Sequence, residues 1–149
     1  VLISAQKEVT GVKHDEKKDK FKVDLSLEDA RPEDFDALLI PGGALNADTL
    51  RVQPKAQEFV KSFEREQKPM AVICHGPWLL VSAGCAKGRR MTSYHTIQDD
   101  LRNAGASWED SEVVVDGNLV TSRQPSDIPA FNRESIKLFA ERTKTRRAA

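Results

Sequence analysis

The sequence has few of the residues that mark secreted, metal-binding or cofactor-binding proteins. Its 149 residues include only two cysteines, Cys74 and Cys85, without the spacing of a zinc ligand set. Two cysteines are too few for a disulfide scaffold, and the three histidines, His14, His75 and His95, are scattered along the chain. No dinucleotide or phosphate-binding loop occurs. We therefore expect no metal and no cofactor, and a reducing cytoplasm is the simplest location.

An excess of charge and a long apolar run are also absent. The 23 Lys and Arg residues equal the 23 Asp and Glu residues, so no summed field attracts nucleic acid or an anionic membrane surface. No apolar run approaches the roughly 20 residues that span a bilayer. The basic segment 142–147 is the local exception, and we expect a solvated terminus there. The length suits a single domain, residues 1–149, with neither nucleic acid nor membrane as a partner.

Apolar runs alternate with amphipathic segments along the chain. Continuous runs predict buried strands at residues 1–3, 37–40 and 70–73, and the segments 113–115 and 119–121 predict a hairpin. Helical spacing predicts helices that start near residues 54, 77, 96 and 126, whereas the charged stretch 13–20 predicts a loop or an edge hairpin. This alternation is typical of an α/β fold, a three-layer sandwich with a mostly parallel sheet covered on both faces.

The ends of the predicted helices carry specific signals. Gly84 is placed to end the helix that starts near residue 77, and Thr96 is placed to cap the helix that Gly105 ends. The last helix is expected to run from about residue 126 into the low 140s. Its expected core contacts are Phe131, Leu138 and Phe139.

Cys74 carries the strongest functional signal. It ends the apolar run 70–73 and is followed at once by His75-Gly76-Pro77 and a helix-like stretch. A strand that stops at a nucleophile and turns directly into a helix is a nucleophile elbow, where the helix N-terminus favours the thiolate. Most free cysteines are inert packing residues, but this context favours a reactive thiol. Cys85 is expected to be structural.

A glycine turn follows the predicted strand 37–40. Because the carboxyl ends of parallel strands meet at one edge of a sheet, the turn Pro41-Gly42-Gly43 should converge with the elbow at Cys74. The missing side chains let backbone N–H groups approach a ligand. We expect the N–H groups of Gly43 and His75 to form an oxyanion hole. Taken alone, such a glycine pair is more often a plain turn.

Five stretches of the sequence resemble the ThiJ/PfpI family of the class I glutamine amidotransferase-like superfamily. They are residues 34–43 (DFDALLIPGG), 71–77 (AVICHGP), 92–94 (TSY), 100–106 (DLRNAGA) and 113–118 (VVVDGN). The resemblance is closest to the PfpI branch and implies a flavodoxin-like fold. It also implies a cysteine-dependent stress-response hydrolase, either a deglycase or glyoxalase or an intracellular peptidase. A homodimer or hexamer is implied as the assembly.

The resemblance implies roles for individual residues. Cys74 matches the family nucleophile and His75 the histidine beside it. Gly42, Gly76 and Tyr94 are assigned to substrate binding.

An acidic residue of the family follows the glycine turn and reaches the histidine of a neighbouring subunit. Asp48 falls close to that position, and its alternative is an N-cap for the turn before Leu50. Consecutive side chains at a tight turn generally point apart. We therefore expect His75 to point away from Cys74 of its own subunit, so that an acid from a second subunit orients it.

The chain departs from the family pattern at its start. The family begins with a further strand and helix, and a Glu in the loop after that strand hydrogen-bonds the nucleophilic sulfur. Residues 1–3 match the second family strand, so the first strand, the first helix and this Glu have no counterpart here. We expect a fragment of a longer protein, because buried backbone groups left unpaired in a sheet cost about 1–3 kcal/mol each.

Two classes of function are open at this point. In the first, the Cys74 thiolate attacks a carbonyl group. A small carbonyl compound or a glycated protein would give a hemithioacetal, and a peptide would give an acyl-enzyme. In the second, Cys74 oxidises to a sulfinic acid in a redox-sensing or chaperone-like stress protein without turnover. A glutaminase is disfavoured because it needs a late histidine, and none follows His95.

Overall fold

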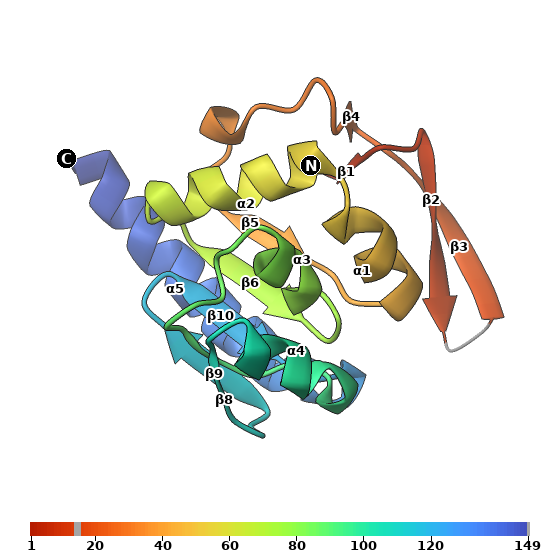
Figure 1. Ribbon diagram of the computed structural model, residues 1–149. Coiled ribbons are helices and arrows are strands. Elements are labelled where there is room, and N and C mark those ends of the chain that lie inside the picture. The colour runs from red at the N-terminus through yellow and green to blue at the C-terminus, as the bar shows by residue number, and fades with distance from the viewer. Residues whose placement is uncertain (14–15, 149) are drawn as a thin grey trace. The chain divides into compact units, whose positions relative to one another are not determined.

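The computed structural model describes residues 1–13 and 16–148, with side chains described for residues 1–12 and 16–141 (Figure 1). His14 lies outside the described residues, as do the side chains of the basic segment 142–147. The contacts divide the chain into two compact units, Val1–Asp34 and Phe35–Ala149. The expectation of one domain over residues 1–149 stays a prediction.

The first unit consists of short paired strands. Strand β1 (Ile3–Ser4) pairs in parallel with β4 (Leu25–Ser26), and the antiparallel hairpin of β2 (Glu8–Lys13) and β3 (Glu16–Lys22) lies between them in sequence. The 3₁₀ helix η1 (Pro32–Asp34) ends the unit. The predicted buried strand at residues 1–3 is wrong in extent and burial, since Val1 is 85% exposed and Leu2 38%. The paired strand begins at Ile3 and is only two residues long.

The second unit is built on a four-stranded sheet. Its order is β5 (Leu38–Ile40), β6 (Met70–Ile73), β10 (Leu119–Ser122) and β9 (Val113–Asp116). The first three strands are parallel, and β9 joins β10 through the predicted antiparallel hairpin. Every residue of β10 is buried, which explains the continuous apolar runs that identified the central strands. The predicted mostly parallel sheet is confirmed.

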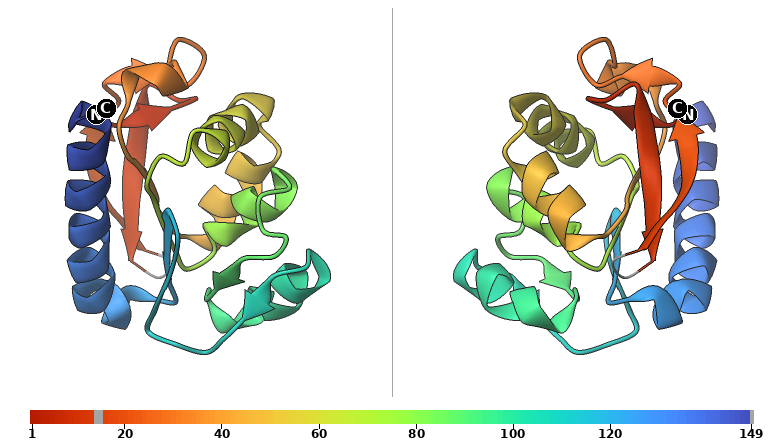
Figure 2. Two further views of the ribbon diagram at one scale, coloured as in Figure 1. Left: turned by 90° about the vertical axis from the view of Figure 1, so that its left-hand side faces the viewer. Right: turned by 90° about the vertical axis from the view of Figure 1, so that its right-hand side faces the viewer.

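Helices cover both faces of this sheet. Figure 2 shows α5 (Ile128–Ala148) on one face and α1 (Ala44–Arg51), α2 (Pro54–Arg65) and α3 (Pro77–Ser82) on the other. Helix α2 buries its predicted stripe, Ala56, Phe59, Val60 and Phe63. Helix α5 extends beyond its expected end. Its residues Phe131 and Leu138 share a core cluster with Ala71 and Val120, and Phe139 packs against that cluster as predicted.

A smaller element pair completes the unit. Strands β7 (Arg90–Met91) and β8 (Ser107–Trp108) run parallel, with the 3₁₀ helix η2 (His95–Ile97) and helix α4 (Gln98–Asn103) between them. Gly84 and Gly105 adopt positive φ after α3 and α4, so both predicted helix ends are confirmed. The predicted cap at Thr96 is wrong, because Thr96 lies inside η2 and Ile97 precedes α4 without any side-chain capping bond.

None of the helices within residues 1–13 and 16–148 has the length and apolar character needed to cross a bilayer.

Candidate active site

Cys74 sits at a strained turn between β6 and α3. Its φ of 64° lies in the left-handed region, which non-glycine residues rarely adopt and which costs about 1–3 kcal/mol. Two backbone hydrogen bonds hold the residue there. Its N–H donates to the carbonyl of Ser122 at 3.0 Å, and its carbonyl accepts the N–H of Tyr94 at 2.9 Å. The predicted nucleophile elbow is therefore confirmed in its geometry.

Two glycines allow neighbouring backbone to approach this turn. A Cβ on Gly42 would lie 2.5 Å from Cβ and 3.2 Å from Sγ of Cys74. A Cβ on Gly76 would lie 2.8 Å from Cγ1 of Val72 and 3.0 Å from the carbonyl oxygen of Ile73. Real Cβ atoms do not come so close, so both positions require glycine. The structure thus brings the glycine turn against the thiol, as the topology predicts.

The two amides assigned to the oxyanion hole are available. Within residues 1–13 and 16–148, neither the N–H of Gly43 nor that of His75 donates to a backbone carbonyl. Gly43 has a φ of 89° and its carbonyl accepts the N–H of Ala47 at 2.9 Å, which starts α1. The assignment of these two amides to an oxyanion hole stays a prediction.

The imidazole of His75 lies against the thiol of its own chain. Its Nδ1 is 3.2 Å from Sγ of Cys74, and its Nε2 is 3.3 Å from Oγ1 of Thr96. The expectation that these consecutive side chains point apart is wrong. The left-handed backbone at Cys74 changes the direction of the chain, and the His75 ring packs near Trp78 and Tyr94, with centroids 5.4 and 4.9 Å away.

The surroundings of His75 disfavour its charged form. Burial lowers the pKa of this imidazole, and the charge of His95 lowers it further. His75 is therefore neutral at pH 7, since an ordinary histidine titrates near pH 6.5. A neutral ring nitrogen beside a thiol can accept the thiol proton.

Asp48 lies apart from this cluster in its own chain. It is exposed in the interior of α1, whose N-cap is Gly43, so the alternative of an N-cap role is wrong. Across the described part of the chain, its side chain has no hydrogen bond or ion pair. Its assignment to the histidine of a second copy stays a prediction.

Tyr94 and Thr96 come to the site from the segment after β7. The half-buried Tyr94 is tied to Cys74 through its N–H, which places its ring near His75. Sequence reasoning assigned Tyr94 to the site but missed Thr96, because the position of Thr96 before an amphipathic helix indicated a cap. Its place two residues after Tyr94 is the only sequence signal that could have pointed to the site.

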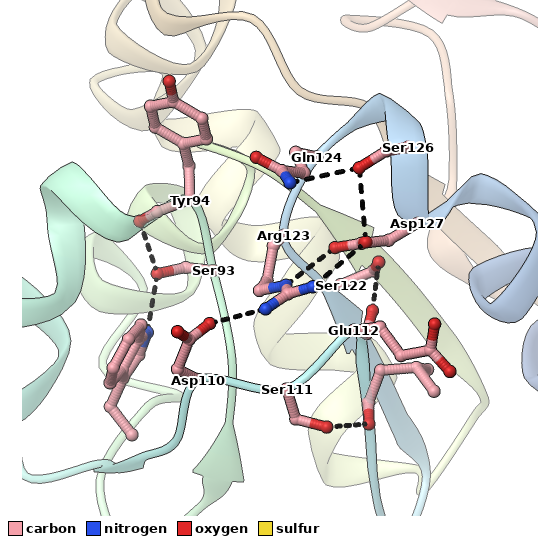
Figure 3. A network of polar contacts seen from close by, with 12 residues as sticks. Ser93, Tyr94, Asp110, Ser111, Glu112, Ser122, Arg123, Gln124, Ser126 and Asp127 are labelled. Atoms are coloured by element: carbon pink, nitrogen blue, oxygen red, sulfur yellow. Dashed lines mark hydrogen bonds and ion pairs between the residues drawn. The ribbon is translucent and has the colours of Figure 1, made fainter.

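A polar network fixes the loops that support the elbow (Figure 3). The guanidinium of Arg123 donates to Asp127 at 2.8 Å and to Asp110 at 2.7 Å, and these carboxylates raise its pKa. The hydroxyl of Ser122 donates to the carbonyl of Glu112 at 2.6 Å. Because the Ser122 carbonyl holds Cys74, this network fixes one side of the elbow.

A separate pair of hydrogen bonds supports Tyr94. Ser93 is fully buried, accepts the indole N–H of Trp108 at 2.9 Å and donates to the carbonyl of Tyr94 at 3.0 Å (Figure 3). A buried hydroxyl with both partners satisfied is well fixed. The residues that lead to η2 are therefore held on both sides.

In the part of the chain that the structure describes, no three His, Cys, Asp or Glu side chains are grouped so as to hold a metal ion.

Comparison with known proteins places the chain among similar sequences and folds. The DJ-1/PfpI family pattern matches residues 1–138. Deglycase PfpI of Pyrococcus furiosus is 51% identical over 118 residues, which cover 79% of this chain and 70% of that protein. YraA of Bacillus subtilis is 50% identical over 137 residues, covering 92% and 78%. The structure of Drosophila melanogaster DJ-1beta has a TM-score of 0.73 at 30% identity and covers 85% of this chain and 71% of that one.

Proposed function

The chain belongs to the DJ-1/PfpI family, and from this premise we propose that it is a deglycase or glyoxalase in which Cys74 is the nucleophile. Relatives named deglycase, at about 50% identity, support a PfpI-type hydrolase as the general class. The observation that carries the finer proposal is the 3.2 Å contact between Sγ of Cys74 and Nδ1 of His75 at a strained elbow.

The proposed reaction begins with attack of Sγ on an electrophilic carbonyl carbon. The proton of the thiol moves to Nδ1 of His75, a C–S bond forms, and the carbonyl π electrons move to oxygen. The amides of Gly43 and His75 then hold the developing oxyanion. A proton then moves from the hemithioacetal carbon to the adjacent carbonyl carbon, which gives a thioester. Water cleaves the C–S bond of this thioester and releases a hydroxy acid and the thiol.

The surroundings of the thiol favour a small carbonyl compound over a peptide. Backbone of Gly42 approaches the sulfur on one side, and the rings of His75, Trp78 and Tyr94 gather beside it. Glycated protein is the second candidate substrate, because its adduct is presented on a side chain.

Assembly is part of the proposal. We propose a dimer or hexamer in which Asp48, exposed on α1, reaches the site of the partner subunit.

Consumption of methylglyoxal tests the proposed function. We expect Cys74→Ala to lower kcat/KM by about 1,000-fold or more, because the nucleophile is removed. Cys85→Ala is the matched control and should retain the wild-type rate.

Equal rates for wild type and Cys74→Ala would remove Cys74 from the mechanism. Peroxide titration followed by intact mass measurement separates the redox alternative. Uptake of two oxygen atoms at Cys74, together with no turnover of any carbonyl compound, would replace the proposal with a redox sensor.

A further inference from the structure

Both ring nitrogens of His75 have a partner, and only one of these partners is the thiol. We propose that Thr96 is a positioning residue, whose hydroxyl oxygen accepts the Nε2–H of His75 and so keeps Nδ1 unprotonated toward Cys74. The inference rests on the proposed function, in which Nδ1 takes the thiol proton. The contact between Thr96 and His75 lies within one chain.

The position of the Thr96 hydroxyl follows from well-fixed backbone. Thr96 lies in η2, which follows directly after Tyr94, and the N–H of Tyr94 donates to the carbonyl of Cys74 at 2.9 Å. The next residue, Ile97, is 1% exposed, and its N–H donates to the carbonyl of Tyr94 at 3.2 Å. These anchors fix the backbone on both sides of the exposed Thr96, whose hydroxyl lies 3.3 Å from Nε2 of His75.

The chemistry of the two contacts determines which nitrogen carries the proton. A neutral imidazole has one N–H donor and one acceptor nitrogen. When Nε2–H donates to Thr96, Nδ1 becomes the acceptor, 3.2 Å from Sγ. As the proton leaves Sγ for Nδ1, the Nε2–H bond to Thr96 is retained, so the ring need not rotate. A base oriented by a third group is the general arrangement of nucleophilic triads.

A hydroxyl and a carboxylate beside Nε2 of His75 have different effects on the charge of the imidazole. A carboxylate beside Nε2 would favour the imidazolium and raise the pKa of His75. Cys74 and Tyr94 contact this ring, and burial together with the charge of His95 lowers the pKa of His75. An uncharged orienting group matches this neutral imidazole.

Substitution of Thr96 tests the inference with two independent readouts. Thr96→Val removes the hydroxyl at nearly constant shape, Thr96→Ser retains it, and Thr10→Val on the exposed hairpin is the matched control. The first readout is the two-bond ¹H–¹⁵N spectrum of His75, which shows the nitrogen that carries the proton. The second is methylglyoxal turnover, with kcat and KM determined separately. Thermal unfolding verifies that each variant is folded.

We expect wild type and Thr96→Ser to show the Nε2–H tautomer, and Thr96→Val to show a mixture. The loss of one orienting hydrogen bond should lower kcat roughly fivefold to tenfold with KM unchanged. Thr96→Ser should restore kcat, and Thr10→Val should leave it at the wild-type value.

An unchanged His75 spectrum in Thr96→Val would overturn the inference. So would a loss of kcat in Asp48→Asn that Thr96→Val does not share, because the orienting group would then be Asp48 of the partner subunit. If wild type consumes no carbonyl compound, the proposed function fails, and the spectrum of His75 still decides the role of Thr96.

Discussion

The two cysteines lie at opposite ends of α3, and their surroundings differ far more than their exposure. Both are free and half-buried. Cys74 precedes the helix at a left-handed turn, with an imidazole nitrogen 3.2 Å from its sulfur. Cys85 follows Gly84 at the other end, and its Sγ lies 3.6 Å from the carbonyl oxygen of Ala83.

Because both thiols are similarly accessible, we expect their neighbours to determine which one is reactive. Burial raises the pKa of the Cys85 thiol, and the charge of Glu64 raises it further. Its carbonyl partner accepts a hydrogen bond from the thiol and cannot take the proton away. Cys74 instead faces a neutral imidazole that can. The end of α3 that we propose to be reactive is the end where an imidazole nitrogen lies beside the sulfur.

Substitution by Ala of one glycine near each cysteine, Gly42 beside Cys74 and Gly84 before Cys85, should give the largest effects and sharpen this comparison. In Gly42→Ala the new Cβ would lie 2.5 Å from Cβ of Cys74, so the elbow must shift. We expect a loss of about 1–3 kcal/mol of stability and about 100-fold lower methylglyoxal turnover, because misplaced reacting groups are costly.

Gly84→Ala is the matched change at the other end of α3. Its φ is 72° and no atom lies within 4 Å of the added Cβ, so strain alone should cost about 1–2 kcal/mol. Urea unfolding should therefore show a similar loss for both variants, with turnover lost only in Gly42→Ala. Wild-type turnover in Gly42→Ala would show that the close approach does not position Cys74.

A smaller effect is expected in the pH dependence of stability. Burial lowers the pKa of His75 in the folded state. The contribution of His75 to the free energy of unfolding is therefore fully present above its unfolded-state pKa, near 6.5, and is lost as the pH falls through its folded-state pKa. The folded-state pKa of Cys85 is raised, so its contribution is present below about pH 8.5 and is lost as pH rises.

Urea unfolding at about pH 5.5, 7 and 9.5 measures both contributions. His75→Gln should weaken the acid dependence alone, and Cys85→Ala should weaken the alkaline dependence alone. If both variants follow the wild-type curve at every pH, folding does not shift the pKa of His75 or of Cys85, and this contrast between the two ends of α3 is wrong.

The sequence predicted the parts of the site that local patterns determine. The apolar run before Cys74 and the helix pattern after it predicted the elbow, and the order of parallel strands predicted its meeting with Gly42 and Gly43. The continuous apolar runs of the strands that are buried on both faces and the apolar stripe of α2 were equally local signals. These features follow from periodicity and turn chemistry.

The remaining features depend on tertiary placement. The orientation of His75 follows from the positive φ of Cys74 and from packing near Trp78 and Tyr94, which no spacing rule gives. Thr96 carried the signal of a helix cap, and the 3₁₀ turn at residues 95–97 instead directs its hydroxyl to His75. The predicted burial of residues 1–3 was wrong because strand pairing, not composition, sets the extent of β1.

Competitive alkylation of the native wild-type protein tests the central claim most directly. Iodoacetamide at less than one equivalent and neutral pH, followed by peptide mass mapping, gives the labelled fraction of each cysteine. We predict that Cys74 is labelled at least tenfold faster than Cys85 and faster than an unfolded control peptide of the same sequence. Equal labelling of the two thiols, or Cys74 no faster than the peptide, would contradict the account.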